Sequence, residues 1–273
     1  MYTMINLRKF NFLSTRKIIP SFFLNVLGLQ IFRVLLSMTI SKFNRGNKGI
    51  CLDTTFEKDG YLRIDNFVNS DDMNLITAEV IELVNSVPPM VKRADGSNEY
   101  ENWGPGQYSK YLSIENFFIS NKFREALVKI IGIKNIKEDH LVLLVERLTQ
   151  GADGFEDPET QVHEDTFHAT HKGWLYINQV NPEHGPFIYY RGSHKITIRK
   201  LINIYLNSVK KTPVASRRIS YNELRHFEEK IFCVPKNTLL FADTFGFHGR
   251  IKGKENAMRL ALSFSYRPNP FTN

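Results

Sequence analysis

The sequence predicts a mainly β protein with flanking helices, an α+β chain whose strands form an antiparallel barrel or sandwich. From residue 140 onward, short apolar runs alternate with Gly, Pro, Asn and Asp, which is typical of such folds. The 21 phenylalanines and 11 tyrosines favour strands and an aromatic-lined pocket over a helical bundle. With 273 residues, 42% of them hydrophobic, the chain can bury one large core.

Residues 1–48 are predicted to form a basic N-terminal arm and linker. Of the 36 Lys and Arg residues, eight lie within the first 50 positions, which contain no Asp or Glu. The remaining 28 basic residues balance the 28 acidic ones. The net charge of +8 therefore belongs to the arm, and the neutral body gives no reason to expect a nucleic-acid partner.

Within the arm, residues 18–43 are predicted to form an amphipathic helix. The charge of Arg33 interrupts the apolar run and argues against a membrane-spanning helix. A helix with basic flanks could lie on a membrane surface, or it could pack on the body. The polar residues recur at helical spacing: Ser21, Asn25, Gly28, Arg33, Ser37 and Ser41.

Two cysteines, far apart in the sequence, give no disulfide framework, so a reducing compartment is expected. The expected location is the cytoplasm, where the protein could lie at a membrane surface. A mitochondrial location is the alternative, because a transit peptide is also basic and poor in acidic residues.

The body, residues 49–273, is predicted to begin with a turn and a short strand within 56–64. Asn69 then offers an N-cap for a helix that ends near Asn85, and a second helix is expected over 121–131. The first helix has an apolar face that consists of Met73, Ile76, Val80 and Leu83.

Apolar runs separated by turn residues predict the buried strands of the body. A partly helical excursion, residues 195–230, interrupts them and is placed to form a lid over the mouth of a site. The stretch 191–220 has eight Lys or Arg and no acidic residue, which favours an anionic substrate, although a solvated basic face is the alternative. The predicted strands cover 141–145, 173–180, 187–190, 231–234, 239–241 and 260–266.

The candidate metal ligands are His163, Asp165 and His248. Alternation along a strand places His163 and Asp165 on one side and turns Glu164 away, toward a structural role. Two imidazoles and one carboxylate form a facial ligand set for Fe(II) that leaves coordination positions open. Arg259, eleven positions after His248, can clamp a carboxylate with two parallel hydrogen bonds. Together these residues point to a non-haem Fe(II) oxygenase that uses 2-oxoglutarate and dioxygen, whereas the three ligands alone fit other metals as well.

A zinc protease is disfavoured, because Phe167 stands where the H-E-x-x-H motif needs its second histidine. His168 and His171 lie nearby and are expected to be surface or hydrogen-bonded residues. His194 is expected to have a structural role in a tight turn.

The order of these motifs resembles the phytanoyl-CoA dioxygenase family between about Thr55 and Tyr266. The segments are H-E-D, then G-P-F-I-Y-Y-R-G-S-H-K at 185–195, D-T-F-G-F-H-G-R at 243–250, and Arg259. The resemblance implies a double-stranded β-helix core of the jelly-roll or cupin-like kind, with Fe(II) and 2-oxoglutarate. It also implies that His163, Asp165 and His248 bind iron and that Arg259 binds the distal carboxylate of 2-oxoglutarate.

Two further residues are expected near the co-substrate. Arg250 could reach 2-oxoglutarate or the substrate, and Lys110 lies where members of the family that the chain resembles place a loop over the co-substrate. Because Asp165 is a carboxylate and not a small residue, hydroxylation is favoured over halogenation. The expected substrate is a small molecule that contains phosphate, coenzyme A or a glycan. The alternatives are a cupin-like metal-dependent sugar isomerase or epimerase, and a non-catalytic metal-binding barrel.

Overall fold

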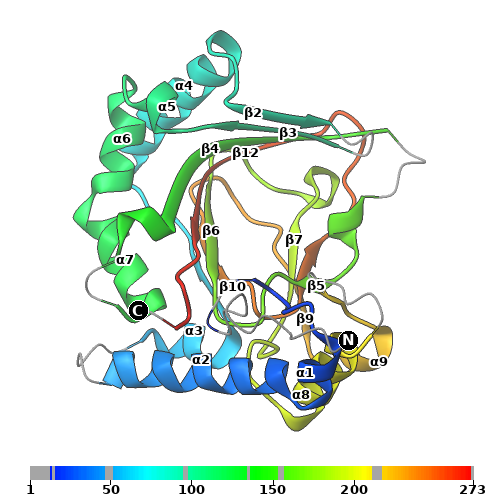
Figure 1. Ribbon diagram of the computed structural model, residues 1–273. Helices are drawn as coiled ribbons and strands as arrows, with labels where there is room; N and C mark the ends of the chain where they lie inside the picture. Colours follow the sequence, from blue (N-terminus) through cyan, green and yellow to red (C-terminus); the bar gives the residue numbers. More distant parts are fainter. Residues whose placement is uncertain are drawn as a thin grey trace, which may run out of the picture.

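Two antiparallel sheets form the core of the computed structural model, which describes Leu13 and residues 16–46, 52–94, 98–133, 136–152, 157–210 and 217–271 (Figure 1). The larger sheet has the order β1-β10-β6-β12-β4-β3-β2, and the smaller has the order β8-β5-β11-β7-β9. Their strands are β1 (Tyr61–Ile64), β2 (Val91–Ala94), β3 (Asn98–Trp103), β4 (Leu141–Gln150), β5 (His163–Glu164), β6 (His171–Tyr176), β7 (Phe187–Tyr190), β8 (Arg217–Arg218), β9 (Glu229–Ile231), β10 (Leu239–Asp243), β11 (His248–Arg250) and β12 (Met258–Tyr266).

Helices cover one face of the larger sheet and close one end of the molecule (Figure 1). The helices α4 to α7 lie on the outer face, and α1, α2 and α8 lie together beneath the sheets. The described helices are α1 (Phe22–Val26), α2 (Leu29–Gly46), α3 (Thr54–Asp59), α4 (Ser70–Ser86), α5 (Pro105–Tyr108), α6 (Leu112–Ile119), α7 (Asn121–Ile131), α8 (Ile198–Ser208) and α9 (Tyr221–Leu224), with 3-10 turns η2 (Glu138–His140), η3 (Pro158–Thr160) and η4 (Pro182–His184).

Alternation along the central strands divides the side chains of the larger sheet between two hydrophobic clusters. Phe241 of β10 packs with the helix side chains, such as Met73 of α4 and Phe123 of α7. Its neighbour Leu240 points to the other face, where it packs with Tyr189 of the smaller sheet. The prediction of a mainly β core with flanking helices is confirmed, and the two packed antiparallel sheets have the jelly-roll arrangement.

Two predicted helices are confirmed. Asn69 caps α4 through its side chain, which accepts a hydrogen bond from the backbone N–H of Asp72 at 2.9 Å. The second predicted helix is α7, which ends at Gly132 in the left-handed conformation that favours glycine.

The helical part of the predicted arm packs against the body. Val34 of α2 lies in one buried cluster with Ile204 of α8 and Phe245. Arg33 is also buried, and its guanidinium lies 4.2 Å from the ring centroid of Phe167. Among the described helices, none combines the length and the apolar character that a bilayer crossing requires.

The excursion at 195–230 contributes to the framework in addition to any role as a lid. Its strand β8 pairs with β5 and so extends the smaller sheet, while α8 packs against α1 and α2. Several of its basic residues have acidic partners: Lys200 lies 3.6 Å and Arg217 2.9 Å from carboxylate oxygens of Glu164. These two cations are therefore not available to attract an anionic substrate.

Candidate metal centre

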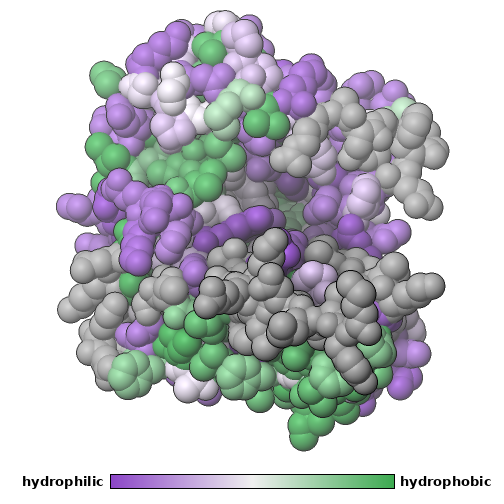
Figure 2. Space-filling view, in the orientation of Figure 1, coloured by the Kyte–Doolittle hydropathy of each residue, from purple (hydrophilic) through white to green (hydrophobic). Residues whose placement is uncertain are grey.

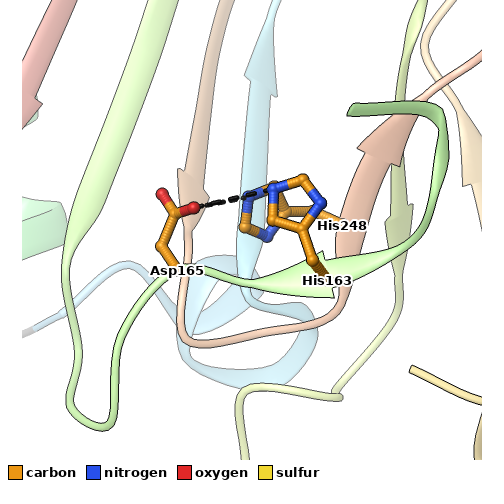
Figure 3. Close-up of side chains that lie close together, drawn as sticks. All are labelled: His163, Asp165 and His248. Atoms are coloured by element: carbon orange, nitrogen blue, oxygen red, sulfur yellow. Dashed lines mark ion pairs between the residues drawn. The ribbon is translucent and has the colours of Figure 1, made fainter. Parts of the chain in front are cut away.

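The three predicted metal ligands meet between the two sheets (Figure 3). His163 on β5 and His248 on β11 are directly opposite each other in the antiparallel register, and their ring centroids are 4.5 Å apart. Asp165 follows β5, and its backbone N–H donates to the carbonyl oxygen of Thr244 at 2.9 Å. The Oδ1 of Asp165 lies 3.6 Å from the Nε2 of His163 and 3.7 Å from the Nε2 of His248. All three residues are buried, so the candidate ligand atoms converge in a shielded position.

Backbone carbonyl groups fix both imidazoles in the tautomer that a metal ligand needs. The Nδ1 of His163 lies 2.9 Å from the carbonyl oxygen of Gln161, and the Nδ1 of His248 lies 2.9 Å from that of Gly246. A carbonyl oxygen only accepts, so each Nδ1 carries the proton and each Nε2 presents a lone pair. Two nitrogen lone pairs therefore face the carboxylate of Asp165. A cation bound among these three groups would remove the repulsion between the lone pairs and the carboxylate. This donor set fits a divalent metal ion.

The electrostatic environment keeps these groups in their ligating protonation states. Burial lowers the pKa of His248 to about 4, so its imidazole is neutral at pH 7. Burial opposes the ionisation of Asp165, but the ammonium group of Lys172, 2.7 Å away, holds its pKa below the usual value.

A second carboxylate, Glu159, lies beside the site. Its Oε2 is 3.3 Å from the Nε2 of His163. Glu159 lies in η3 and is half-exposed, so it stands at the edge of the candidate centre.

Arg259 lines the same cavity as His248. The cavity has a volume of about 770 Å³, and Trp174 and Phe187 form part of its apolar wall. The Nη1 of Arg259 donates to the carbonyl oxygen of Gly185 at 2.6 Å, which orients the guanidinium. Among the described residues, its buried Nε has no hydrogen-bond partner. A buried donor without a partner is unfavourable, and the carboxylate of a ligand in this cavity would satisfy it.

The other two predicted cofactor residues have different positions. Arg250 lines the cavity, but its Nε donates to Asp157 at 2.7 Å, so this guanidinium already has a carboxylate partner. Lys110 is exposed between α5 and α6, with its ammonium 5.0 Å from the ring centroid of Tyr111. Lys110 does not line the cavity, because the α5–α6 turn lies on the outer face of the larger sheet. This placement argues against its predicted contact with the co-substrate.

The side chain of Glu164 points away from the ligands, as the alternation predicts. It accepts two hydrogen bonds from Arg217, of 2.9 and 3.3 Å, and Arg217 also donates to Glu223 at 2.7 Å. The buried pair joins β5, which contains His163, to β8. Glu164 therefore supports the strand that holds a candidate ligand.

Replacement of Arg217 by alanine should destabilise the protein by about 3–5 kcal/mol, because it leaves the buried carboxylate of Glu164 without its main partner. Chemical denaturation measures this change. The matched control is Arg218→Ala, since Arg218 is the exposed neighbour on β8 and should change the free energy of unfolding by about 0.5 kcal/mol or less. Equal effects of the two changes would contradict the structural role of the pair.

The turn that follows β7 supports the second histidine strand. Gly192 has a φ of 75°, and the Ser193 hydroxyl accepts a hydrogen bond from the backbone N–H of Phe247 at 2.7 Å. The Nε2 of His194 lies 3.2 Å from the carbonyl oxygen of Glu57, which confirms its structural role. Neither His168 nor His171 belongs to the ligand group found among the described residues.

Sequence reasoning missed Lys172, Glu159 and Asp157. Lys172 lies on β6 two residues before Trp174, so both side chains point to the same face of the sheet. This alternation was the available signal that Lys172 faces the cavity. Glu159 and Asp157 lie in irregular backbone around η3, for which no periodic pattern exists.

Compared by sequence, the chain matches no protein-family model and no curated protein. The comparison with solved structures finds chains of similar fold. The α-ketoglutarate-dependent epimerase SnoN from nogalamycin biosynthesis, in complex with Fe3+, α-ketoglutarate and nogalamycin RO, has a TM-score of 0.55 and 14% identity over 79% of this chain and 84% of that one. The non-haem α-ketoglutarate-dependent carbocyclase SnoK has a TM-score of 0.50 and 12% identity over 78% and 81% of the two chains. The likeness is one of fold.

Proposed function

We propose that this protein is a non-haem Fe(II)- and 2-oxoglutarate-dependent enzyme that oxidises a small molecule. The observation that carries the proposal is the convergence of His163, Asp165 and His248, whose candidate ligand atoms lie within 4.8 Å of one another. The cavity at this centre also contains Arg259, which is suited to a carboxylate. Structures with the same fold include enzymes whose names specify α-ketoglutarate, and this supports the choice of co-substrate.

Each residue has a defined task in the proposed enzyme. His163, Asp165 and His248 would hold iron on one face, and Arg259 would orient the far carboxylate of 2-oxoglutarate. When bound, the iron would supply the oxidation of a C–H bond of the substrate to C–OH, while 2-oxoglutarate and dioxygen are converted to succinate and carbon dioxide. The protein provides the ligands, the orientation and a partly apolar cavity wall that excludes water.

More specifically, we propose hydroxylation by an enzyme of the phytanoyl-CoA dioxygenase type. Asp165 supports this reaction, because its carboxylate fills the position that a halide would need. The exposed basic residues of the excursion, such as Lys195 and Lys210, support an anionic substrate that contains phosphate, coenzyme A or a glycan. The buried, paired state of Lys200 and Arg217 weakens this support, so the substrate class rests on fewer cations than the sequence suggests.

Anaerobic titration with Fe(II) and then 2-oxoglutarate tests the proposal. Chelation of iron by a 2-oxo acid gives a visible charge-transfer band, and admission of dioxygen should then produce succinate. A metal-dependent isomerase or epimerase of the cupin type, or a non-catalytic barrel, would bind metal but would show neither the band nor succinate. Absence of the band with iron bound would therefore exclude 2-oxoglutarate as co-substrate.

A further inference from the structure

The helices α1 and α2 turn their polar side chains toward the body of the protein. Asn25 is buried, and its Nδ2 donates to the carbonyl oxygens of Ile19 and Ser208 at 3.0 and 3.1 Å. Arg33 is buried as well, and its guanidinium donates to the side chain of Gln30 at 2.9 Å. A surface helix of a water-exposed domain normally buries its apolar side and exposes its polar side. Much of this pattern is reversed here.

The outward side of these helices is correspondingly apolar. Phe22 and Phe23 of α1 are 65% and 70% exposed, and Phe43 near the end of α2 is 67% exposed. On α8, Ile198 is 79% exposed and begins a stripe with four-residue spacing. We call these side chains the apolar face: Phe22, Phe23, Val26, Leu27, Phe32, Leu35 and Phe43 from the N-terminal helices, and Ile198, Ile202 and Leu206 from α8.

The two parts of the apolar face lie on one side of the molecule. The Tyr205 hydroxyl of α8 donates to the carbonyl oxygen of Val26 at 3.1 Å. Beneath the surface, Val34 and Ile204 share a buried cluster, so α2 and α8 pack side by side. Figure 2 shows hydrophobic residues along the lower edge of the molecule, where Figure 1 places α1, α2 and α8. Isolated exposed apolar residues are common, but a contiguous set marks an interaction surface.

The charges on the helices that form the apolar face are of one sign. Residues 1–50 and 191–220 contain no Asp or Glu, so α1, α2 and α8 carry no acidic side chain. Exposed cations are adjacent in the sequence to residues of the apolar face. Examples are Lys42 next to Phe43 and Arg199 next to Ile198. A second copy of the chain would bring two positive surfaces together, and that arrangement is unfavourable. An anionic lipid surface matches both the apolar side chains and the charge.

We propose that the apolar face docks the protein onto an anionic membrane surface, with α1, α2 and α8 lying in the interface and their polar stripe directed into the protein. The aromatic and aliphatic side chains would enter the boundary between headgroups and acyl chains. The basic residues would contact lipid phosphate or carboxylate groups. This inference is independent of the proposed oxidation, because the docking surface contains none of the candidate metal ligands.

Vesicle co-sedimentation of the full chain, without added metal, tests the docking. Vesicles of phosphatidylcholine with phosphatidylserine should bind the protein, and vesicles of phosphatidylcholine alone should bind it at least about fivefold more weakly. The double change Phe22→Ser and Phe23→Ser should weaken binding by roughly tenfold or more. Leu112→Ser on α6 is the matched control, because Leu112 is 65% exposed but lies far from the apolar face, and it should leave binding unchanged.

A tryptophan probe adds a readout of depth. In Phe23→Trp, the emission should shift to the blue with the anionic vesicles and should be quenched by brominated acyl chains. Leu112→Trp should show neither change. The proposal is overturned if the serine variants bind like the unchanged protein, or if no vesicle binds. It is also overturned if the apolar face instead forms a dimer that Phe22→Ser and Phe23→Ser dissociate in light-scattering measurements.

Discussion

Replacement of His248 by alanine should abolish iron binding and iron-dependent succinate formation together. The Nε2 of His248 lies 3.7 Å from the Oδ1 of Asp165, and its Nδ1 is held by the carbonyl oxygen of Gly246. Loss of residues that merely orient metal ligands already weakens metal affinity by about 10–100-fold, so loss of a ligand should exceed that range. Equilibrium titration with Fe(II) under anaerobic conditions measures the affinity directly.

His168→Ala is the matched control for this change. His168 is also buried, and its Nδ1 bonds to the carbonyl oxygen of Ala169, but it does not belong to the ligand group. This variant should keep the iron affinity within about threefold of the unchanged protein, because a surface or structural histidine contributes no metal bond. Thermal unfolding of both variants separates a folding defect from a loss of ligation. Normal iron affinity in a folded His248→Ala protein would rule out the proposed centre.

The local signals in the sequence predicted the elements that depend on local chemistry. Asn69 caps α4 through a bond to Asp72, three residues away, and such a bond can be foreseen from the sequence. The strands β2 and β3 were not foreseen, because their sequences V-K-R-A and N-E-Y-E-N-W are largely polar. Pairing with β4 sets the position of β3, and that partner lies more than 40 residues away along the chain.

The candidate site was predictable to a similar extent. Alternation placed His163 and Asp165 on one side of a strand, and the structure brings His248 opposite His163. The contact of Lys172 with Asp165 depends on how β6 and β5 meet, and no local pattern contains that information. The placement of Lys110 could not be foreseen either, since position in the order of motifs does not determine which face of a sheet a turn occupies.

The N-terminal helices give a third case. Helical spacing grouped Asn25, Arg33 and Ser37 on one side of a single predicted helix. The structure divides that helix into α1 and α2, and all three side chains are buried. The direction of that side could not be derived from spacing, because it depends on partners such as Phe167 and the carbonyl oxygen of Ser208. A periodic pattern therefore defines a face, while tertiary contacts decide whether it meets protein or solvent.

Replacement of Arg259 by lysine should weaken the binding of 2-oxoglutarate selectively. A lysine keeps the charge but loses the planar fork that forms two parallel hydrogen bonds with a carboxylate. Loss of such a buried charged contact costs about 2–4 kcal/mol, which corresponds to roughly 30–1,000-fold in affinity. The charge-transfer band of the anaerobic iron complex provides the titration signal.

The choice of 2-oxo acid makes this test specific to the distal carboxylate. 2-Oxobutyrate can chelate the metal in the same way but has no second carboxylate, so its affinity should be nearly equal for Arg259→Lys and the unchanged protein. Arg147→Lys is the matched control, because Arg147 pairs with Glu101 on the neighbouring strands and does not line the cavity. An equal loss for both oxo acids would mean that Arg259 acts through the shape of the cavity. Undiminished affinity for 2-oxoglutarate would remove Arg259 from the site, and the carboxylate partner would then have to be sought among the other cations of the cavity, Lys92, Lys172 and Arg250.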